Sequence, residues 1–450
     1  MGTSPKRRLL AASAAAVALG VGLSGTALAA PGTSTPGTNT PGTAHSLPDD
    51  AQLYTPPPDK GAVQQVVDLL RHRDVDDAAL VAKMALTPQA VWFTGGTPKQ
   101  VATDVKQTVV RAGALRQVPA LVLYNVPGRD CSQYSSGGAG SDVAYQAWID
   151  GVVKGLGQAR AIVIVEPDGL ANLPSDCPSA YPGQDVDALT QGRIADIKYA
   201  ATTIESSDPN SLVYLDAGNS AWHSVGDISK RLEQAGVASV QGFSLNVSNY
   251  QFTTNTNFYG TWVSECLAYT EKVNVGDYGS CGDMYWSGGP ANNWTGVTLD
   301  RYGVWSDTAS EPTLNTAGIT SRYASILGDT APTAHFVADT SRNGRGPNSM
   351  TAYAAAPYNQ PANVISSLAA GNWCNSPGAG LGLRPTTNTG VALVDAYLWV
   401  KTPGQSDGQC NIAGGARAWD YTQYNPWNWD SAQQQQNDPL WGVQDPAAGA

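Results

Sequence analysis

The sequence lacks the patterns that mark several common functional classes. No two of its six cysteines lie at C-x-x-C spacing, and its four histidines are scattered, which argues against a metal site. Basic clusters are also lacking, and the formal net charge is −11, so nucleic acid and anionic membranes would repel the chain. Nucleophile-elbow and phosphate-loop motifs are likewise missing. A neutral partner is therefore expected.

Apolar runs long enough to span a membrane are missing as well. The one notable run, LLAASAAAVALGVGL, follows Lys6, Arg7 and Arg8 and precedes the small-residue site at positions 27–30. This arrangement predicts a secretory signal peptide over residues 1–30 rather than a membrane span. We therefore expect a secreted, extracellular protein, monomeric and free of membrane contacts.

In an exported protein, six cysteines predict three disulfides. Several pairings are formally possible, and nearness in sequence favours Cys266 with Cys281. Residues 31–58 are rich in Pro, Gly and Thr and repeat the triplet PGT, which predicts a flexible linker or tail. The folded part is expected to cover residues 59–450.

Aromatic residues are unevenly chosen, with 13 Trp and 19 Tyr but only 5 Phe. Trp and Tyr combine an apolar body with a polar group, so the bias favours surfaces and ligand grooves over dry cores. The alternative is that the bias merely reflects a large secreted protein.

Strand-like runs alternate with amphipathic helix candidates along the chain. Such alternation predicts an α/β fold with a parallel sheet, in one domain of βα units. The helix candidates are residues 61–85, 101–115, 143–156 and 186–206. The interval 246–334 is unusually long and predicts an elaborated loop insert closed by its own disulfide. Seven strand-like runs occupy residues 90–93, 119–126, 161–165, 212–215, 240–245, 335–338 and 392–400.

The stretch AIVIVEPDGL at residues 161–170 carries the clearest signal. Its apolar run reads as a central strand that stops at Pro167, so Glu166 and Asp168 lie at a strand's carboxyl end. Ligands bind at that end in parallel sheets and barrels. The alternative is that the two acids cap a helix or solvate a loop.

Polar residues also follow the other strands, and their types indicate glycoside hydrolysis. That reaction needs a carboxylic acid kept protonated for the leaving oxygen and an opposing carboxylate or water chain. Asp130 near Asp168 would raise the proton affinity of one of them. The residues after the strands are Tyr124, Arg129, Asp130, Ser136, Glu166, Asp168, Asp216, Asn219, Trp222, Asp339, Arg342, Lys401 and Asp407.

Two blocks, LVLYNVPGRDCSQYSSGGAG and AIVIVEPDGL, resemble the signature regions of glycoside hydrolase family 6, the inverting cellulases. NVSNY, DTSRNG, NWCNSPGAGLG and DAYLWVKTPGQSDG resemble further blocks in the expected order, so the likeness runs from Trp92 to Asp407. The resemblance implies a distorted seven-stranded parallel β/α barrel, similar to a TIM barrel. It also implies hydrolysis of internal β-1,4-glucosidic bonds of cellulose with inversion, without cofactor or metal.

The same resemblance assigns roles to individual residues. Asp168 matches the general acid, Asp130 the aspartate that modulates its pKa, and Asp407 the proposed base, for which a water chain is the alternative. It further implies the disulfides Cys131–Cys177 and Cys374–Cys410. Ser136 matches the serine that holds the attacking water, Tyr124 the tyrosine that distorts the sugar, and Arg129 the arginine beside the aspartates; the substrate-binding positions are Trp92, Asp216, Asn219, Trp222, Trp373, Lys401 and Gln405.

Three features depart from the family pattern. Asn219 stands where many members have a histidine, and Gln405 replaces a common glutamate near Asp407. The chain also ends at Ala450, before the closing helix of relatives, which suggests a truncated C-terminus. Blocks such as NVSNYQFTT favour the endoglucanase branch; the alternatives are an exo-acting cellobiohydrolase and, more remotely, a non-catalytic carbohydrate-binding protein.

Overall fold

The structure, a computed structural model, describes residues 47–132, 135–286, 296–356, 361–370 and 379–405, together with residues 359, 372, 373, 376 and 407. The expected signal peptide, most of the expected linker and both cysteines of the predicted pair Cys374–Cys410 lie outside these residues.

Seven parallel strands form one sheet in which every strand pairs with its neighbour in sequence. The predicted barrel of βα units is therefore confirmed, with strand positions close to those expected. The strands are β1 (Val91–Phe93), β2 (Ala120–Leu123), β3 (Ile162–Val165), β4 (Leu212–Asp216), β5 (Gly242–Leu245), β6 (His335–Asp339) and β7 (Val394–Leu398).

The sheet curls so that its two edge strands approach each other. The N–H of Ala90, just before β1, donates to Trp399 O at 2.9 Å, and the Trp92 indole donates to Val400 O at 2.8 Å. Two hydrogen bonds thus connect β1 and the residue before it with the segment after β7. Among the residues described, the sheet has no ladder between β1 and β7, so the barrel is distorted.

Residues of β3 alternate between two apolar environments, as the run IVIV predicts. Ile162 and Ile164 pack inside the barrel with Val122 and Tyr214, whereas Val163 and Val165 belong to the larger core beneath the helices. All four residues of β3 are fully buried. Burial on both faces holds the strand rigid up to Glu166.

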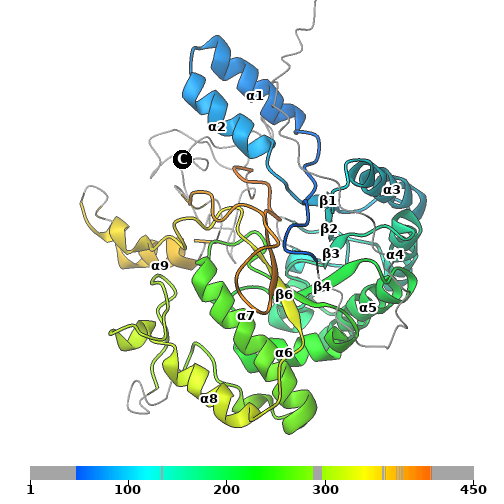
Figure 1. The fold of residues 1–450 in the computed structure, drawn as a ribbon. Coiled ribbons are helices and arrows are strands. Elements are labelled where there is room, and N and C mark those ends of the chain that lie inside the picture. The colour runs from blue at the N-terminus through cyan, green and yellow to red at the C-terminus, as the bar shows by residue number, and fades with distance from the viewer. Residues whose placement is uncertain are drawn as a thin grey trace, which may run out of the picture. The chain divides into compact units, whose positions relative to one another are not determined.

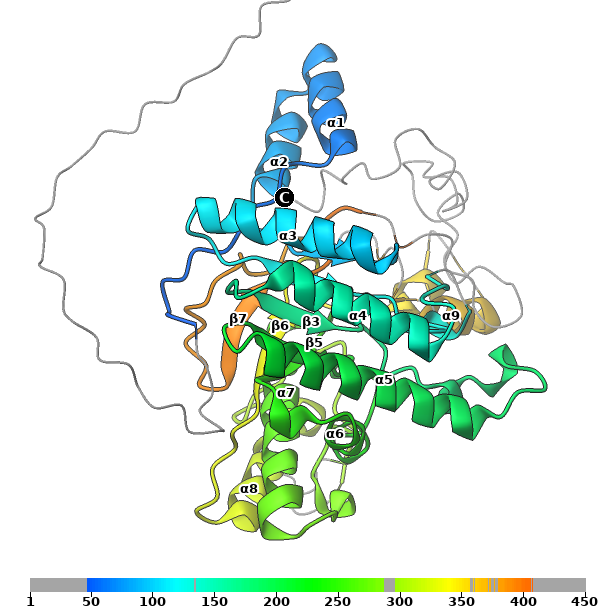
Figure 2. The same ribbon diagram turned by 90° about the vertical axis from the view of Figure 1, so that its right-hand side faces the viewer.

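Helices cover the outside of the sheet, and α3, α4 and α5 lie side by side over it (Figures 1 and 2). Local capping sets where they begin: Thr97 and Gln100 form a capping box before α3, and Ser141 and Asp185 cap α4 and α5. The helices are α1 (Lys60–Arg71), α2 (Val75–Ala85), α3 (Pro98–Ala114), α4 (Asp142–Leu156), α5 (Val186–Ser207), α6 (Val225–Gln234), α7 (Thr253–Ala268), α8 (Ala317–Leu327) and α9 (Ala362–Ala370).

The expected single helix over residues 61–85 is wrong, because the chain forms two helices there (Figure 1). Arg73 adopts a left-handed φ of 65°, which breaks the helical repeat. The hairpin closes over a small apolar cluster of Ala62, Val81 and Met84. The run RHRD at residues 71–74 contains no apolar residue, so the apolar pattern is interrupted at the break, and the expectation of one helix disregarded this interruption.

The packed part of the chain also begins earlier than the expected boundary at Asp59. Leu53 forms a parallel bridge with Val118, and Leu47, Leu53 and Tyr54 are buried. The Thr387 hydroxyl donates to Pro48 O at 2.9 Å. The end of the predicted linker therefore contacts the barrel.

The tryptophans serve the core more than their composition suggested. Trp148, Trp262, Trp305 and Trp399 are almost fully buried. Their indoles can still be satisfied, since those of Trp148 and Trp305 donate to the loop carbonyls Gly95 O and Asp300 O at 2.9 and 2.8 Å. The bias toward rings with a polar group thus also serves helix-to-loop packing.

The insert at 246–334 contains α7 and α8 and the disulfide Cys266–Cys281, as nearness in sequence predicted. Trp305 stacks on Trp262 of α7, with ring centroids 5.8 Å apart, so this part of the insert is core. Trp294 lies outside the described residues. In the part of the chain described, no helix combines the length and apolarity needed to cross a membrane.

Candidate active site

Glu166, the first residue after β3, is a buried acceptor for the backbone of the neighbouring strand end. Its carboxylate accepts the N–H groups of Asn125 and Val126 at 2.9 and 3.0 Å. Burial raises the pKa of Glu166 to about 7, and these hydrogen bonds oppose that effect. Glu166 is thus neither a helix cap nor a solvated loop residue; it ties the end of β3 to the end of β2.

Asp168 stands two residues further along, with a left-handed φ of 62°. Its side chain is partly buried, and its N–H donates to Asp216 Oδ1 at 2.9 Å. Burial, together with the carboxylates of Asp216 and Asp130, raises the pKa of Asp168 well above its ordinary value. Non-glycine residues are rarely held at such a φ, and they cluster at active sites. The surroundings therefore favour the protonated form of this carboxyl.

Asp216, at the end of β4, has both carboxylate oxygens occupied. Oδ1 also accepts the N–H of Gly218 at 3.1 Å, and Oδ2 accepts the Ser244 hydroxyl at 2.9 Å. Burial raises the pKa of Asp216 to about 7. Its direct contact is with the backbone of Asp168, whereas the family resemblance suggested a sugar-binding position.

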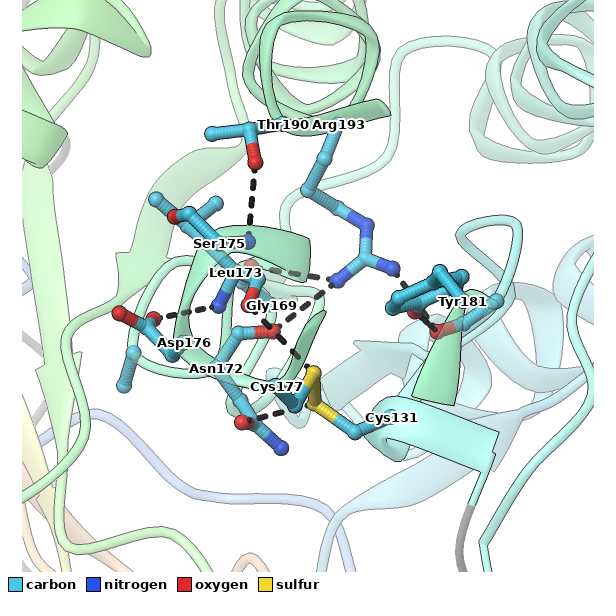
Figure 3. The surroundings of a disulfide bond; sticks show 12 residues. Cys131, Gly169, Asn172, Leu173, Ser175, Asp176, Cys177, Tyr181, Thr190 and Arg193 are labelled. Carbon is cyan, nitrogen blue, oxygen red and sulfur yellow. Dashed lines mark hydrogen bonds between the residues drawn. A yellow bond between two sulfur atoms is a disulfide. The ribbon is translucent and has the colours of Figure 1, made fainter. Parts of the chain in front are cut away.

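Asp130 lies on the loop after β2, again at a left-handed φ, of 57°. Its Oδ2 accepts the N–H of Ser135 at 2.8 Å, and burial raises its pKa, although Ser135 and Arg129 oppose the rise. The next residue, Cys131, forms the predicted disulfide with Cys177, which ties this loop to the chain after β3 (Figure 3).

Arg129 and two aromatic rings pack beside Asp130. The Arg129 guanidinium lies 4.4 Å from the centre of the Tyr124 ring and donates to Tyr124 O and Thr94 O. Trp92 meets Tyr124 edge to face with ring centroids 5.6 Å apart. Ser136 is exposed on the same loop. Four of the predicted site residues are thus brought together around Asp130.

Asp407 lies among cations. Arg342 Nη1 contacts Asp407 Oδ2 at 2.8 Å, and Lys401 Nζ contacts Oδ1 at 3.2 Å. The Tyr250 hydroxyl donates to Oδ2 at 3.3 Å, and the Arg342 guanidinium stacks on the Tyr250 ring. Burial lowers the pKa of Lys401, and the Asp407 carboxylate opposes that effect. Asp407 adds a further negative charge near Asp168.

The remaining predicted positions differ in their exposure. Trp373 is 37% exposed, and Trp222 is partly buried and stacks on His223. Asn219 is buried, and its Oδ1 accepts the N–H of Ala221 at 3.0 Å, so it first stabilises its own turn. Gln405 is partly buried, and its N–H donates to Thr402 O.

Sequence reasoning missed two residues and gave a third, Asp339, no role of its own. Tyr250 lies in the block NVSNY without being singled out, and Arg193 was overlooked, although a charge on the apolar face of a helix next to Ile197 was a usable signal. Asp339 is the last residue of β6, at the strand end where the sequence placed it, and it accepts four N–H groups, from Ser248, Ser341, Val400 and Lys401. It therefore organises three loops.

The chemistry available is that of carboxyl groups. Within the described residues no group of three or more His, Cys, Asp or Glu side chains could hold a metal ion. Asp168, whose pKa is raised by burial and by neighbouring carboxylates, can donate a proton to a leaving group.

Comparison with known proteins shows which family the chain matches. Residues 48–437 match the family described as Glycosyl hydrolases family 6. The chain is 33% identical to Endoglucanase A of Cellulomonas fimi over 76% of its length, and 30% identical to Endoglucanase 1 of Streptomyces halstedii over 76%. It covers 54% of the first relative and 77% of the second.

The chain is also similar to a solved structure of an endoglucanase. The endoglucanase Cel6 from Mycobacterium tuberculosis, in complex with methyl-cellobiosyl-4-deoxy-4-thio-β-D-cellobioside, is 30% identical to this chain. The match covers 82% of this chain and 93% of the other, with a TM-score of 0.53.

Proposed function

Because the chain belongs to glycoside hydrolase family 6, we propose that it is a cellulase that hydrolyses internal β-1,4-glucosidic bonds with inversion of anomeric configuration. The observation that carries this proposal is Asp168, a carboxyl group at a barrel strand end with a pKa well above its ordinary value. Such a group can protonate a glycosidic oxygen near neutral pH.

In this proposal Asp168 is the general acid and Asp130 and Asp216 keep it protonated. The negative charges of both carboxylates disfavour ionisation of Asp168. Arg129 balances the charge of Asp130, and Tyr124 offers a ring edge that presses the sugar out of its relaxed shape. As the acid gives up its proton, the leaving glucose takes it, and water attacks the opposite face of the ring.

Activation of that water falls to Asp407, directly or through a second water, with Ser136 holding the nucleophile. Both carboxylate oxygens of Asp407 already contact a cation, Arg342 at Oδ2 and Lys401 at Oδ1, so we favour a water chain over direct contact between Asp407 and the nucleophile. Trp92, Trp222 and Trp373 supply aromatic faces for glucose rings, and Lys401, Asn219 and Gln405 supply polar groups.

The proposed setting is outside the cell. A signal peptide at residues 1–30 would direct export, and a Pro/Thr/Gly-rich linker would lead into a single catalytic domain. The substrate is cellulose or another β-1,4-glucan, which is uncharged and compatible with the acidic chain.

Two measurements on the full chain test the proposal. Proton NMR of cellopentaose hydrolysis should show α-anomers first at the new reducing ends; β-anomers first would refute inversion. Carboxymethylcellulose should lose viscosity faster than it gains reducing ends. A slow viscosity loss with cellobiose as almost the sole product would favour the exo alternative, and binding without turnover would favour a carbohydrate-binding protein.

A further inference from the structure

Residues 125–128, which connect β2 to Arg129 and Asp130, are held through their backbone from two sides. Glu166 accepts the N–H groups of Asn125 and Val126. On the other side Arg193 Nη2 donates to Pro127 O at 2.7 Å and to Gly128 O at 2.9 Å. Four consecutive residues therefore have a backbone group bound by a buried charged side chain.

Arg193 also reaches the loop that carries Asp168. Its Nη1 donates to Gly169 O at 3.4 Å and to Asn172 O at 3.5 Å (Figure 3). The side chain comes from α5, and the residue is only 4% exposed. One planar guanidinium thus bridges the loop after β2 and the loop after β3, each through two carbonyl groups.

The hydrogen bonds of Arg193 serve geometry more than charge pairing. All four go to neutral carbonyl groups, and the nearby carboxylates of Glu166 and Asp196 act on the guanidinium through space. A buried charge is expensive to desolvate, and such through-space attraction offsets part of that cost. The neighbours Ile197, Ala200 and Ala201 on the same face of α5 are fully buried apolar residues. An apolar residue at position 193 would continue that face but would leave both loops without their common donor.

We propose that Arg193 is a positioning residue whose guanidinium fixes the loop of Asp130 against the loop of Asp168 and thereby sets the separation of the two carboxyl groups. The proposal rests on the role of Asp168 as general acid given above. The disulfide Cys131–Cys177 begins one residue after Asp130 and joins the same two segments covalently.

The consequence of losing Arg193 follows from electrostatics. The Asp130 carboxylate helps to raise the pKa of Asp168. If the loop of Asp130 moves away, Asp168 loses its proton at a lower pH, so the alkaline limb of the pH profile moves to lower pH. A lysine at 193 keeps the charge but not the planar fork that spans two pairs of carbonyls.

Arg231 provides a matched control. It lies on α6, is also largely buried, and donates to Leu170 O at 2.9 Å on the loop after β3. Its other contacts are with Asp176 and Asp227, outside residues 125–128. Arg231→Met therefore removes a comparable guanidinium from the same neighbourhood without touching the bridge to Asp130.

The experiment compares the wild type, Arg193→Met, Arg193→Lys and Arg231→Met by two readouts. Hydrogen exchange of the peptide covering residues 121–132 needs no turnover. The pH dependence of kcat/KM on cellopentaose, whose leaving oxygen needs a proton, reports the acid. We expect faster exchange, a drop in kcat/KM of up to about 100-fold and an alkaline limb at lower pH in both Arg193 variants. Arg231→Met should show the wild-type exchange rate and limb.

Exchange or an alkaline limb at the wild-type value in a folded Arg193 variant would overturn the proposal, as would an equal shift in Arg231→Met. Arg193→Lys serves where Arg193→Met does not fold. A wild-type protein that hydrolyses no β-1,4-glucan would refute the proposed function instead, and the exchange rates would still decide whether Arg193 holds the loop of Asp130.

Discussion

The backbone N–H of Asp168 donates to the Asp216 carboxylate at 2.9 Å, which joins the ends of β3 and β4. Asp216 thus acts on Asp168 in two ways: the hydrogen bond holds its left-handed backbone in place, and the negative charge opposes ionisation of its side chain. Substitution can separate the two effects because they depend on different properties of residue 216.

Asp216→Asn should move the alkaline limb of kcat/KM to lower pH. The amide keeps an oxygen for the N–H groups of Asp168 and Gly218 and can donate to the Ser244 hydroxyl, but the charge is lost. Since burial raises the pKa of Asp216 to about 7, that charge exists only above about pH 7. The profiles of variant and wild type should therefore coincide below this pH and diverge above it.

Ser244→Ala is the control for that experiment. It removes one hydrogen bond to Asp216 and keeps the carboxylate. Its alkaline limb should stay near that of the wild type. Divergence of Asp216→Asn over the whole pH range would indicate a displaced Asp168 backbone and would contradict the electrostatic account.

Much of this architecture was predictable because it depends on local pattern. Burial on both faces of Ala161–Val165 and the break at Pro167 place Asp168 at a strand end, and repetition of that pattern predicts the barrel. The places of Asp130 and Asp168 after two successive strands also predicted that the two acids lie near each other. The polar run at residues 71–74 could have indicated a helix break, but the left-handed backbone of Arg73 could not be predicted, because hydrophobic periodicity does not specify the φ of a single polar residue.

The partners of each acid were harder to predict because they are backbone groups. Glu166, Asp216 and Asp339 all bind N–H groups of other loops, and any residue type supplies an N–H. Arg193 binds carbonyls in the same way. Such contacts depend on where loops lie in space, so the sequence identified the acids but not which of them touch substrate and which hold the loops.

Asp168→Asn should lower kcat on cello-oligosaccharides by about 10²- to 10⁴-fold, because no group would protonate the leaving oxygen. A 2,4-dinitrophenyl cellobioside has a leaving group that needs no proton, so the variant should retain most of its activity on it. Steady-state rates on both substrates give the comparison. Equal losses on the two would show that Asp168 is not the acid.

His335→Gln should lower stability in acid more than in base. At the amino ends of the strands His335 Nδ1 contacts Asp395 Oδ1 at 2.7 Å, and Asp395 also accepts from Tyr214 and Gln241. Asp395 raises the pKa of His335 above 6.5. A raised folded-state pKa contributes stability that is complete below about pH 6.5 and is lost as pH rises through the raised value.

Urea unfolding of wild type and His335→Gln, repeated at about nine pH values between 5 and 9, measures that contribution to the free energy of unfolding. The difference in free energy of unfolding should shrink toward high pH. His72→Gln, at an exposed histidine after α1, is the control substitution. A His335→Gln difference that grows with pH would have the wrong sign for an ion pair with Asp395.

Asp407→Asn tests whether this carboxylate is mainly a counterion. Arg342 and Asp407 have side chains only 8% and 9% exposed, and Lys401 is the second cation in contact. Without the carboxylate two largely buried cations face each other, so we expect a loss of about 3–5 kcal/mol in the free energy of unfolding. Lys401→Met keeps the pair of Arg342 and Asp407 and should lower the free energy of unfolding clearly less.

Denaturant unfolding of both variants, together with kcat for Asp407→Asn, distinguishes a direct base from a counterion. If Asp407 is a direct base, kcat should fall by at least about 10²-fold even where stability is unchanged. If it is a counterion, the stability should fall. Adding Lys401→Met to Asp407→Asn should then recover part of that stability, because it removes one of the two uncompensated charges.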